Sequence, residues 1–182
     1  MQLGTREENA SYVEIPSNTT PYSLGLRVKN EGADEAVNCQ GTLVCLELIN
    51  TNSDQYNVSS LPLTKALLWT RENRFTGNGS VCIPGNSEAV LEVATCDSDN
   101  YLRFSYATGC EASRAQHQIS RIGDILAVIE VTSQNSQPIY AICLLEKLIF
   151  FYDIKLLQTT DTKPNIEYCR SLISDKGDSQ TV

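Results

Sequence analysis

The chain holds a single histidine, His117, and this limits the nucleophilic chemistry that it could perform. A Ser-His-Asp or Cys-His arrangement needs an imidazole as its base, so any such enzyme would have to use this residue. His117 lies in a polar stretch, residues 107–121, with no nucleophile motif beside it. We therefore interpret it as a solvated loop histidine and assign no catalytic residue.

Two carboxylates stand close together at Asp97 and Asp99, in the run Asp-Ser-Asp-Asn. Hard oxygen ligands at alternate positions suit Ca²⁺, and the run resembles the start of a calcium-binding loop. Such loops carry glycine at the sixth position and glutamate at the twelfth, where this chain has Leu102 and Thr108. We interpret the run as an ordinary acidic turn and assign no metal site. Glycine-rich phosphate-binding motifs do not occur either, so we assign no cofactor.

The cysteines are odd in number, and they stand at positions 39, 45, 82, 96, 110, 143 and 169. None belongs to a Cys-x-x-Cys pair of the kind that zinc sites use. In a regular strand Cys39 and Cys45 would face the same side about 20 Å apart, too far for one metal ion or one disulfide. We interpret the cysteines as reduced structural residues, with disulfides as the alternative.

Strands are the elements that would position these side chains. Residues 22–28 alternate apolar with small or charged side chains, residues 30–32 supply turn chemistry, and a second extended run covers residues 36–49. This order predicts the opening hairpin of an antiparallel sandwich. Residues 81–83 and 89–94, on either side of a Pro-Gly-Asn turn, predict another strand pair.

The last third of the chain has the clearest strand pattern. Residues 123–132 are rich in branched side chains, residues 133–138 make a connection, and residues 139–145 return. No run shows sustained helical periodicity, so we expect at most two short helices, one of them near residues 61–71 or 112–121.

The predicted fold is all-β, a single immunoglobulin-like antiparallel β-sandwich with polar tails. We assign a polar N-terminal tail to residues 1–20, the β-sandwich domain to residues 21–158, and a polar, partly disordered C-terminal segment to residues 159–182. The predicted core residues each lie on the apolar phase of a strand: Leu26, Val28, Leu46, Trp69, Val93, Phe104, Ile129 and Cys143.

The charge balance narrows the classes of partner. A net charge of −8 argues against nucleic acid and anionic membrane surfaces, because neutralising phosphates needs clustered Lys and Arg. The sequence shows no transmembrane segment. The first residues lack the basic and apolar regions of a signal peptide. A cytoplasmic protein is the favoured interpretation, and a truncated anchored or secreted protein is the alternative.

Two segments resemble a known group of domains. The run Leu-Arg-Val-Lys-Asn-Glu-Gly from Leu26, and the run Gly-Asp-Ile-Leu-Ala-Val-Ile-Glu-Val-Thr from Gly123, look like the immunoglobulin-like β-sandwiches of prokaryotic accessory modules, including CARDB-type adhesion modules. The resemblance covers residues 22–157 and implies interaction or scaffolding. Antibody domains carry two disulfide-bonded cysteines with a tryptophan between them in a set spacing, and this chain lacks that spacing. The nearest approach to it is Cys45 and Cys110, with Trp69 between them.

We therefore expect a non-enzymatic interaction or accessory domain that binds another macromolecule, with a protein as the expected partner, no nucleic acid and no membrane insertion. The first alternative is a small enzyme or ligand-binding protein whose site is formed by loops around His117, namely residues 71–80, 97–100 and 107–121. The second alternative is a secreted adhesion or carbohydrate-binding module, which disulfides or glycans would favour. The sequence leaves the oligomeric state open.

Overall fold

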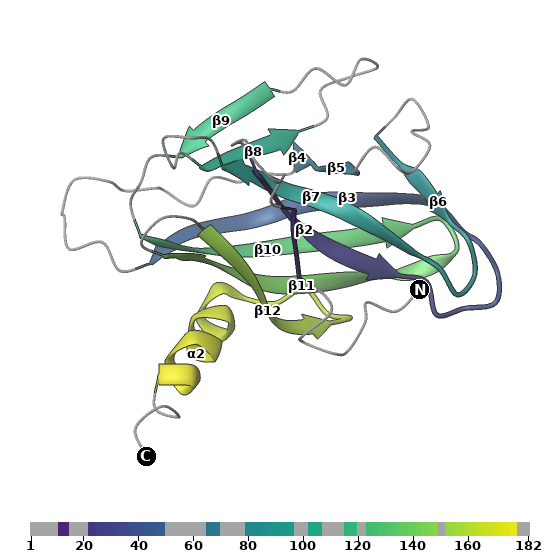
Figure 1. The fold of residues 1–182 in the computed structure, drawn as a ribbon. Helices are drawn as coiled ribbons and strands as arrows, with labels where there is room; N and C mark the ends of the chain where they lie inside the picture. Colours follow the sequence, from purple (N-terminus) through teal and green to yellow (C-terminus); the bar gives the residue numbers. More distant parts are fainter. Residues whose placement is uncertain are drawn as a thin grey trace.

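The structure of the chain is a computed structural model, and strands make up most of it (Figure 1). Its described residues are 11–14, 22–49, 65–69, 79–96, 102–106, 115–119, 123–148 and 152–177. They form two antiparallel sheets and one helix, α2 (Ile166–Gly177). The all-β prediction is confirmed.

The first sheet has the strand order β1-β2-β7-β8-β9, and β5 pairs with β7 beside this path. Its strands are β1 (Ser11–Glu14), β2 (Tyr22–Lys29), β5 (Leu68–Trp69), β7 (Glu88–Cys96), β8 (Leu102–Tyr106) and β9 (Ala115–Ile119).

The second sheet has the order β12-β11-β10-β3-β4, and β6 pairs with β3. Its strands are β3 (Ala36–Ile49), β4 (Lys65–Ala66), β6 (Val81–Ile83), β10 (Asp124–Ser133), β11 (Ser136–Lys147) and β12 (Tyr152–Thr160). The predicted hairpin in the last third of the chain is present, since β10 and β11 pair directly.

The predicted opening hairpin is wrong, because β2 belongs to the first sheet and β3 to the second. The same holds for the other predicted pair, β6 and β7. Instead β2 pairs with β7 and β3 pairs with β6, so two chain segments cross together from one sheet to the other. The turns lie where their residues predict them, but they join two layers.

A buried asparagine holds the two crossings together. Asn30 donates its side-chain Nδ2 to the carbonyl of Asp34 at 2.7 Å and to that of Ile83 at 2.9 Å. Its Oδ1 accepts a hydrogen bond from the Gly32 amide at 3.1 Å. Because a buried amide is stable only when it is hydrogen-bonded, this residue favours the crossing over a local hairpin.

We predict that Gly85→Ala destabilises the protein. A Cβ at Gly85 would lie 2.0 Å from the carbonyl oxygen of Ala33, so one of the two crossings would have to move. Overpacking of this kind costs about 1–3 kcal/mol, which urea unfolding would measure. The control Asn86→Gly should change stability little, because Asn86 has a φ of 57° that glycine adopts readily. Wild-type stability of Gly85→Ala would contradict the close packing of the crossings.

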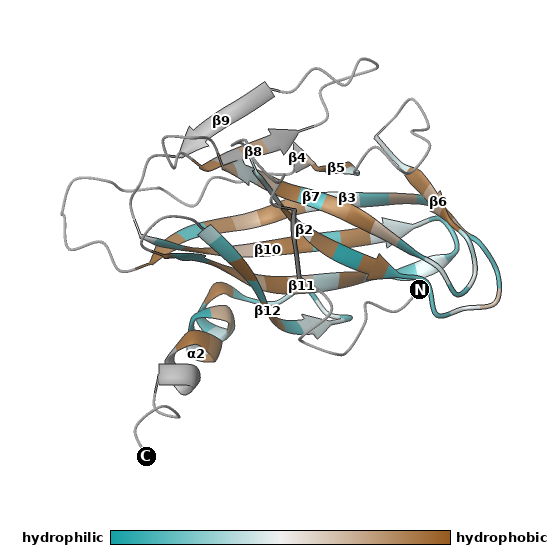
Figure 2. Ribbon diagram, in the orientation of Figure 1, coloured by the Kyte–Doolittle hydropathy of each residue, from teal (hydrophilic) through white to brown (hydrophobic). Residues whose placement is uncertain are grey.

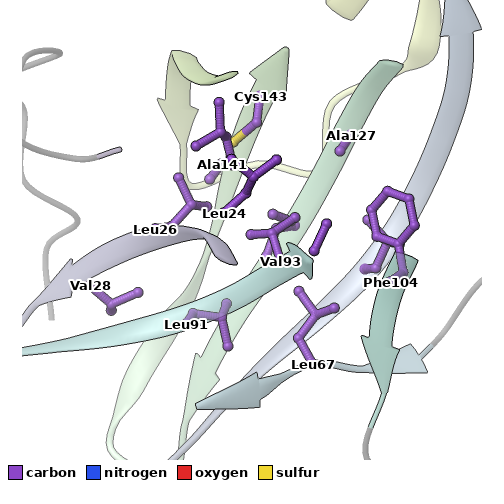
Figure 3. Packing of buried hydrophobic residues seen from close by; sticks show 14 of the residues in the cluster. Leu24, Leu26, Val28, Leu67, Leu91, Val93, Phe104, Ala127, Ala141 and Cys143 are labelled. Carbon is purple, nitrogen blue, oxygen red and sulfur yellow. The ribbon is translucent and has the colours of Figure 1, made fainter. Parts of the chain in front are cut away.

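The main hydrophobic core lies between the two sheets. Figure 3 shows Leu24 and Val93 of the first sheet pointing toward Ala141 and Cys143 of the second. All eight predicted core residues are buried: Leu26, Val28, Leu46, Trp69, Val93, Phe104, Ile129 and Cys143. The alternation of apolar residues therefore predicted this core correctly.

The expectation that Cys39 and Cys45 face the same side is wrong. Cys39 lies in the core between the sheets, whereas Cys45 lies on the outer side of the second sheet. A bulge causes the change, because Leu43 pairs with Ile129 while Cys45 already pairs with Val128. One extra residue in a strand moves all later side chains to the opposite face.

The expected helix positions are also wrong. The described parts of residues 61–71 and 112–121 are strands β4, β5 and β9, which pair with β3, β7 and β8 respectively. Pairing with strands distant in sequence overrides the weak local preference of such short segments.

The helix α2 and the strand β1 lie in the segments that were predicted as polar tails. Asn165 caps the helix, since its Oδ1 accepts a hydrogen bond from the Tyr168 amide at 2.8 Å. Figure 1 shows α2 against the outer side of the second sheet, below β11 and β12. It covers a second, smaller apolar cluster there.

Candidate functional site

The structure places His117 in a strand, which corrects its interpretation as a loop residue. Its backbone lies in β9 opposite Phe104 of β8, because residues 115–119 pair with β8 in a regular antiparallel register. The His117 side chain lies outside the described residues. The same is true of residues 71–78, 97–100 and 107–114, which hold most of the predicted loop site and the calcium-like run.

Six cysteines lie in the described part of the chain, and all six are thiols that form no disulfide there. The seventh, Cys110, lies outside it. Burial raises the pKa of Cys39 to about 11 and raises the pKa of Cys143 further still. A thiol that stays protonated at neutral pH is a poor nucleophile, so these two act as small core residues.

The described ranges of the chain contain neither a metal-binding group nor a membrane-spanning helix. There, no three His, Cys, Asp or Glu side chains gather as a metal-binding group. No helix in the same ranges is long and apolar enough to cross a membrane.

Glu92 is a buried carboxylate that no sequence motif singles out. Only 7% of the residue is exposed, and its Oε2 accepts a hydrogen bond from the Ser23 hydroxyl at 3.4 Å. Its Oε1 is buried and accepts no hydrogen bond from the described residues. Such an atom could accept a bond from an added donor. It is a single group with one neighbouring hydroxyl, however, and does not by itself make a site.

The most developed surface feature is the helix α2 on the second sheet. Tyr168 donates its hydroxyl to Oε1 of Gln158 on β12 at 2.6 Å. Arg170 donates its Nε to both carboxylate oxygens of Glu47 on β3, each at 3.0 Å. Two polar contacts therefore attach opposite flanks of the helix to two different strands, and Cys169 lies between them, buried against the sheet.

Apolar side chains fill the space between this helix and the sheet. The buried members are Leu126, Val128, Tyr140, Ile142, Leu157 and Cys169. Half-buried side chains surround them: Val44, Cys45, Ile49, Leu144, Ile166, Leu172 and Ile173. We call α2, together with the outward side chains of β3, β10, β11 and β12, the helix face. Figure 2 shows its hydrophobic residues on both the helix and the sheet.

The margin of the helix face carries acidic groups. Glu146 forms an ion pair with Lys155. Glu130 accepts a hydrogen bond from the Tyr140 hydroxyl at 2.7 Å, and this bond raises the pKa of Tyr140. Glu47, beside Arg170, is a third acidic group on the outer side of the same sheet. The arrangement provides apolar contact area with charged groups around it, of which Glu146 and Glu47 are in ion pairs.

Two signals in the sequence indicate the helix face, although the assignment of a polar C-terminal segment overlooked both. Residues 125–129 are continuously apolar, which is the pattern of a strand that is buried on both faces. Asn165 followed by Glu167 is a helix start signal, with a cap residue and an acidic residue in the first turn. Comparisons with family models, with curated proteins and with solved structures found no match to the chain.

Proposed function

We propose that the chain is a non-enzymatic β-sandwich that binds another protein through the helix face. The observation that carries the proposal is Tyr168, a residue that is 41% exposed on α2 next to the half-buried apolar residues. Arg170, on the same helix, has 57% of its side chain exposed. Tyrosine and arginine are enriched among the residues that contribute most to protein–protein binding.

The chemistry of the partner follows from the margin of the helix face. Glu47 and Glu146 are paired with Arg170 and Lys155, Glu130 binds only the Tyr140 hydroxyl among the described residues, and the whole chain has a net charge of −8. Electrostatic complementarity then favours a protein surface with an apolar centre and basic residues around it. The affiliation with immunoglobulin-like or CARDB-like accessory modules remains part of the proposal, supported by the two antiparallel sheets. Fold alone does not assign a function.

Tyr168→Ala tests the proposal. Its hydrogen bond to Gln158 is exposed, so we expect the variant to lose at most about 1 kcal/mol of stability. We expect it to bind a purified partner about tenfold more weakly or worse. The partner is first captured from an extract of the source cells with immobilised wild-type protein, and the affinities are then measured by calorimetry. Lys29→Ala, an exposed change on the first sheet, is the matched control and should bind like wild type.

Three results would contradict the proposal. Equal affinities for the Tyr168→Ala and Lys29→Ala variants would remove the helix face as the binding surface. Self-association that depends on Tyr168, seen by sedimentation, would make a second copy of the chain the partner. An enzymatic activity that disappears in His117→Ala would favour the alternative of a small enzyme.

A further inference from the structure

The helix face contains two thiols on opposing elements. Cys45 is half-buried on the outer side of β3, and Cys169 is buried on the side of α2 that faces the sheet. Both belong to the apolar cluster between helix and sheet, and neither forms a disulfide. No sequence pattern indicates this pair, because 124 positions separate the two residues. In addition, Cys45 faces outward only because of the bulge in β3.

An ion pair joins the two elements that carry the thiols. Glu47 follows Cys45 by two residues and therefore lies on the same side of β3. Arg170 follows Cys169 directly in α2 and binds Glu47 with its guanidinium. This contact and the shared apolar cluster place the two thiols on the same side of the second sheet, on facing elements. Cys45 also contributes, after burial, to the raised pKa of Cys169.

We propose that Cys45 and Cys169 form a reversible disulfide that locks α2 onto the second sheet. The oxidant is a low-molecular-weight disulfide such as oxidised glutathione. The Cys45 thiolate attacks one of its sulfurs, and the first glutathione thiolate leaves. The Cys169 thiolate then attacks Sγ of Cys45 and releases the second glutathione. Two electrons pass from the protein thiols to the glutathione disulfide, and the two thiol protons are taken up by the departing thiolates.

The disulfide would restrain α2, a helix with few buried side chains. Of the α2 side chains that the structure describes, Cys169 alone is fully buried. A short helix with few buried contacts opens locally far more often than the core strands do. A disulfide across a long loop restricts such opening. Its effect on partner binding rests on the function proposed above, whereas the disulfide itself does not.

The surroundings of both thiols make the disulfide slow to form at neutral pH. Burial, followed by the charge of Glu47, raises the pKa of Cys45, and Arg170 and Lys163 oppose this effect. Burial, followed by Cys45, raises the pKa of Cys169 to about 11. Because the thiolate is the attacking species, sustained exposure to the oxidant forms the disulfide and a brief exposure does not.

The test treats the full chain with oxidised glutathione and maps its disulfides by peptide mass spectrometry. We expect a Cys45–Cys169 peptide that disappears on reduction. Amide hydrogen exchange in residues 166–173 should slow about tenfold or more in the oxidised protein, while exchange in β10 stays unchanged. Cys45→Ser, a change at the half-buried partner that leaves buried Cys169 in place, should abolish both effects. Cys82→Ser, at a half-buried cysteine on β6, is the matched control and should keep both.

Two results would overturn the proposal: a stable glutathione adduct on Cys45 without the internal disulfide, or equal exchange rates in α2 before and after oxidation. The test is independent of the proposed function. A Cys45–Cys169 disulfide in a protein whose helix face binds no partner would refute the function alone. Partner binding that depends on Tyr168, without the disulfide, would refute the lock alone.

Discussion

Trp69→Ala is expected to lower the free energy of unfolding by about 3–5 kcal/mol. Trp69 is 1% exposed, and it is the largest of the fully buried side chains in the described part of the chain. It lies on β5 opposite Leu91 of β7, facing the core between the sheets. Removing its indole leaves a cavity that the flanking strands cannot close without breaking their pairing. Urea unfolding followed by circular dichroism in both proteins would measure the loss, because the variant lacks the single tryptophan of the chain.

Trp69→Phe separates the packing of the ring from its polar group. The indole Nε1 is buried and has no hydrogen-bond partner among the described residues, so its removal sacrifices no hydrogen bond there. The phenylalanine variant should therefore lose clearly less stability than the alanine variant, because it keeps an aromatic ring in the core. An alanine variant as stable as wild type would show that Trp69 does not fill the core.

The reduced protein is expected to lose about 4 kcal/mol of stability between pH 7 and pH 10, because of its buried thiols. Burial raises the pKa of Cys39 and of Cys169 to about 11, and raises that of Cys143 further, from an ordinary value of 9.0. The unfolded chain releases these protons above pH 9, while the folded chain retains them. Stability is therefore complete below pH 9 and falls as the pH rises toward the folded-state values.

A urea midpoint series from pH 7 to pH 10, in the presence of a reductant, measures this loss. Cys143→Ala removes one of these thiols and should reduce the alkaline loss by about 1.4 kcal/mol at pH 10. Tyr152, whose pKa burial raises to about 12 from an ordinary value of 10.0, adds a smaller loss that begins as the pH approaches 10 and grows above it. A midpoint that stays constant up to pH 10 would contradict the burial of these thiols.

Local sequence patterns predicted the core better than they predicted the connections. Each predicted core residue, from Leu26 to Cys143, lies on the apolar phase of its own strand, and burial follows directly from that phase. The turn at Asn30 is evident from its residues. The destination of the next strand is not, because it depends on hydrogen bonds from Asn30 to a carbonyl 53 residues away.

The candidate site was less predictable for the same reason. The sequence singles out His117 because it is the only histidine of the chain. Its place in β9, however, is determined by pairing with β8. The helix face depends on the bulge that turns Cys45 outward and on the contact between Glu47 and Arg170, residues that are 123 positions apart. No local pattern encodes either feature.

The sequence by itself determined that the chain forms strands and which side of most strands is buried. These properties depend on side-chain alternation and on the spacing of neighbouring residues, which are local. Only the tertiary structure decided which sheet each strand joins and that α2 covers a second apolar cluster. These outcomes depend on contacts between distant segments, where burial and hydrogen bonding between the two sheets outweigh local preference.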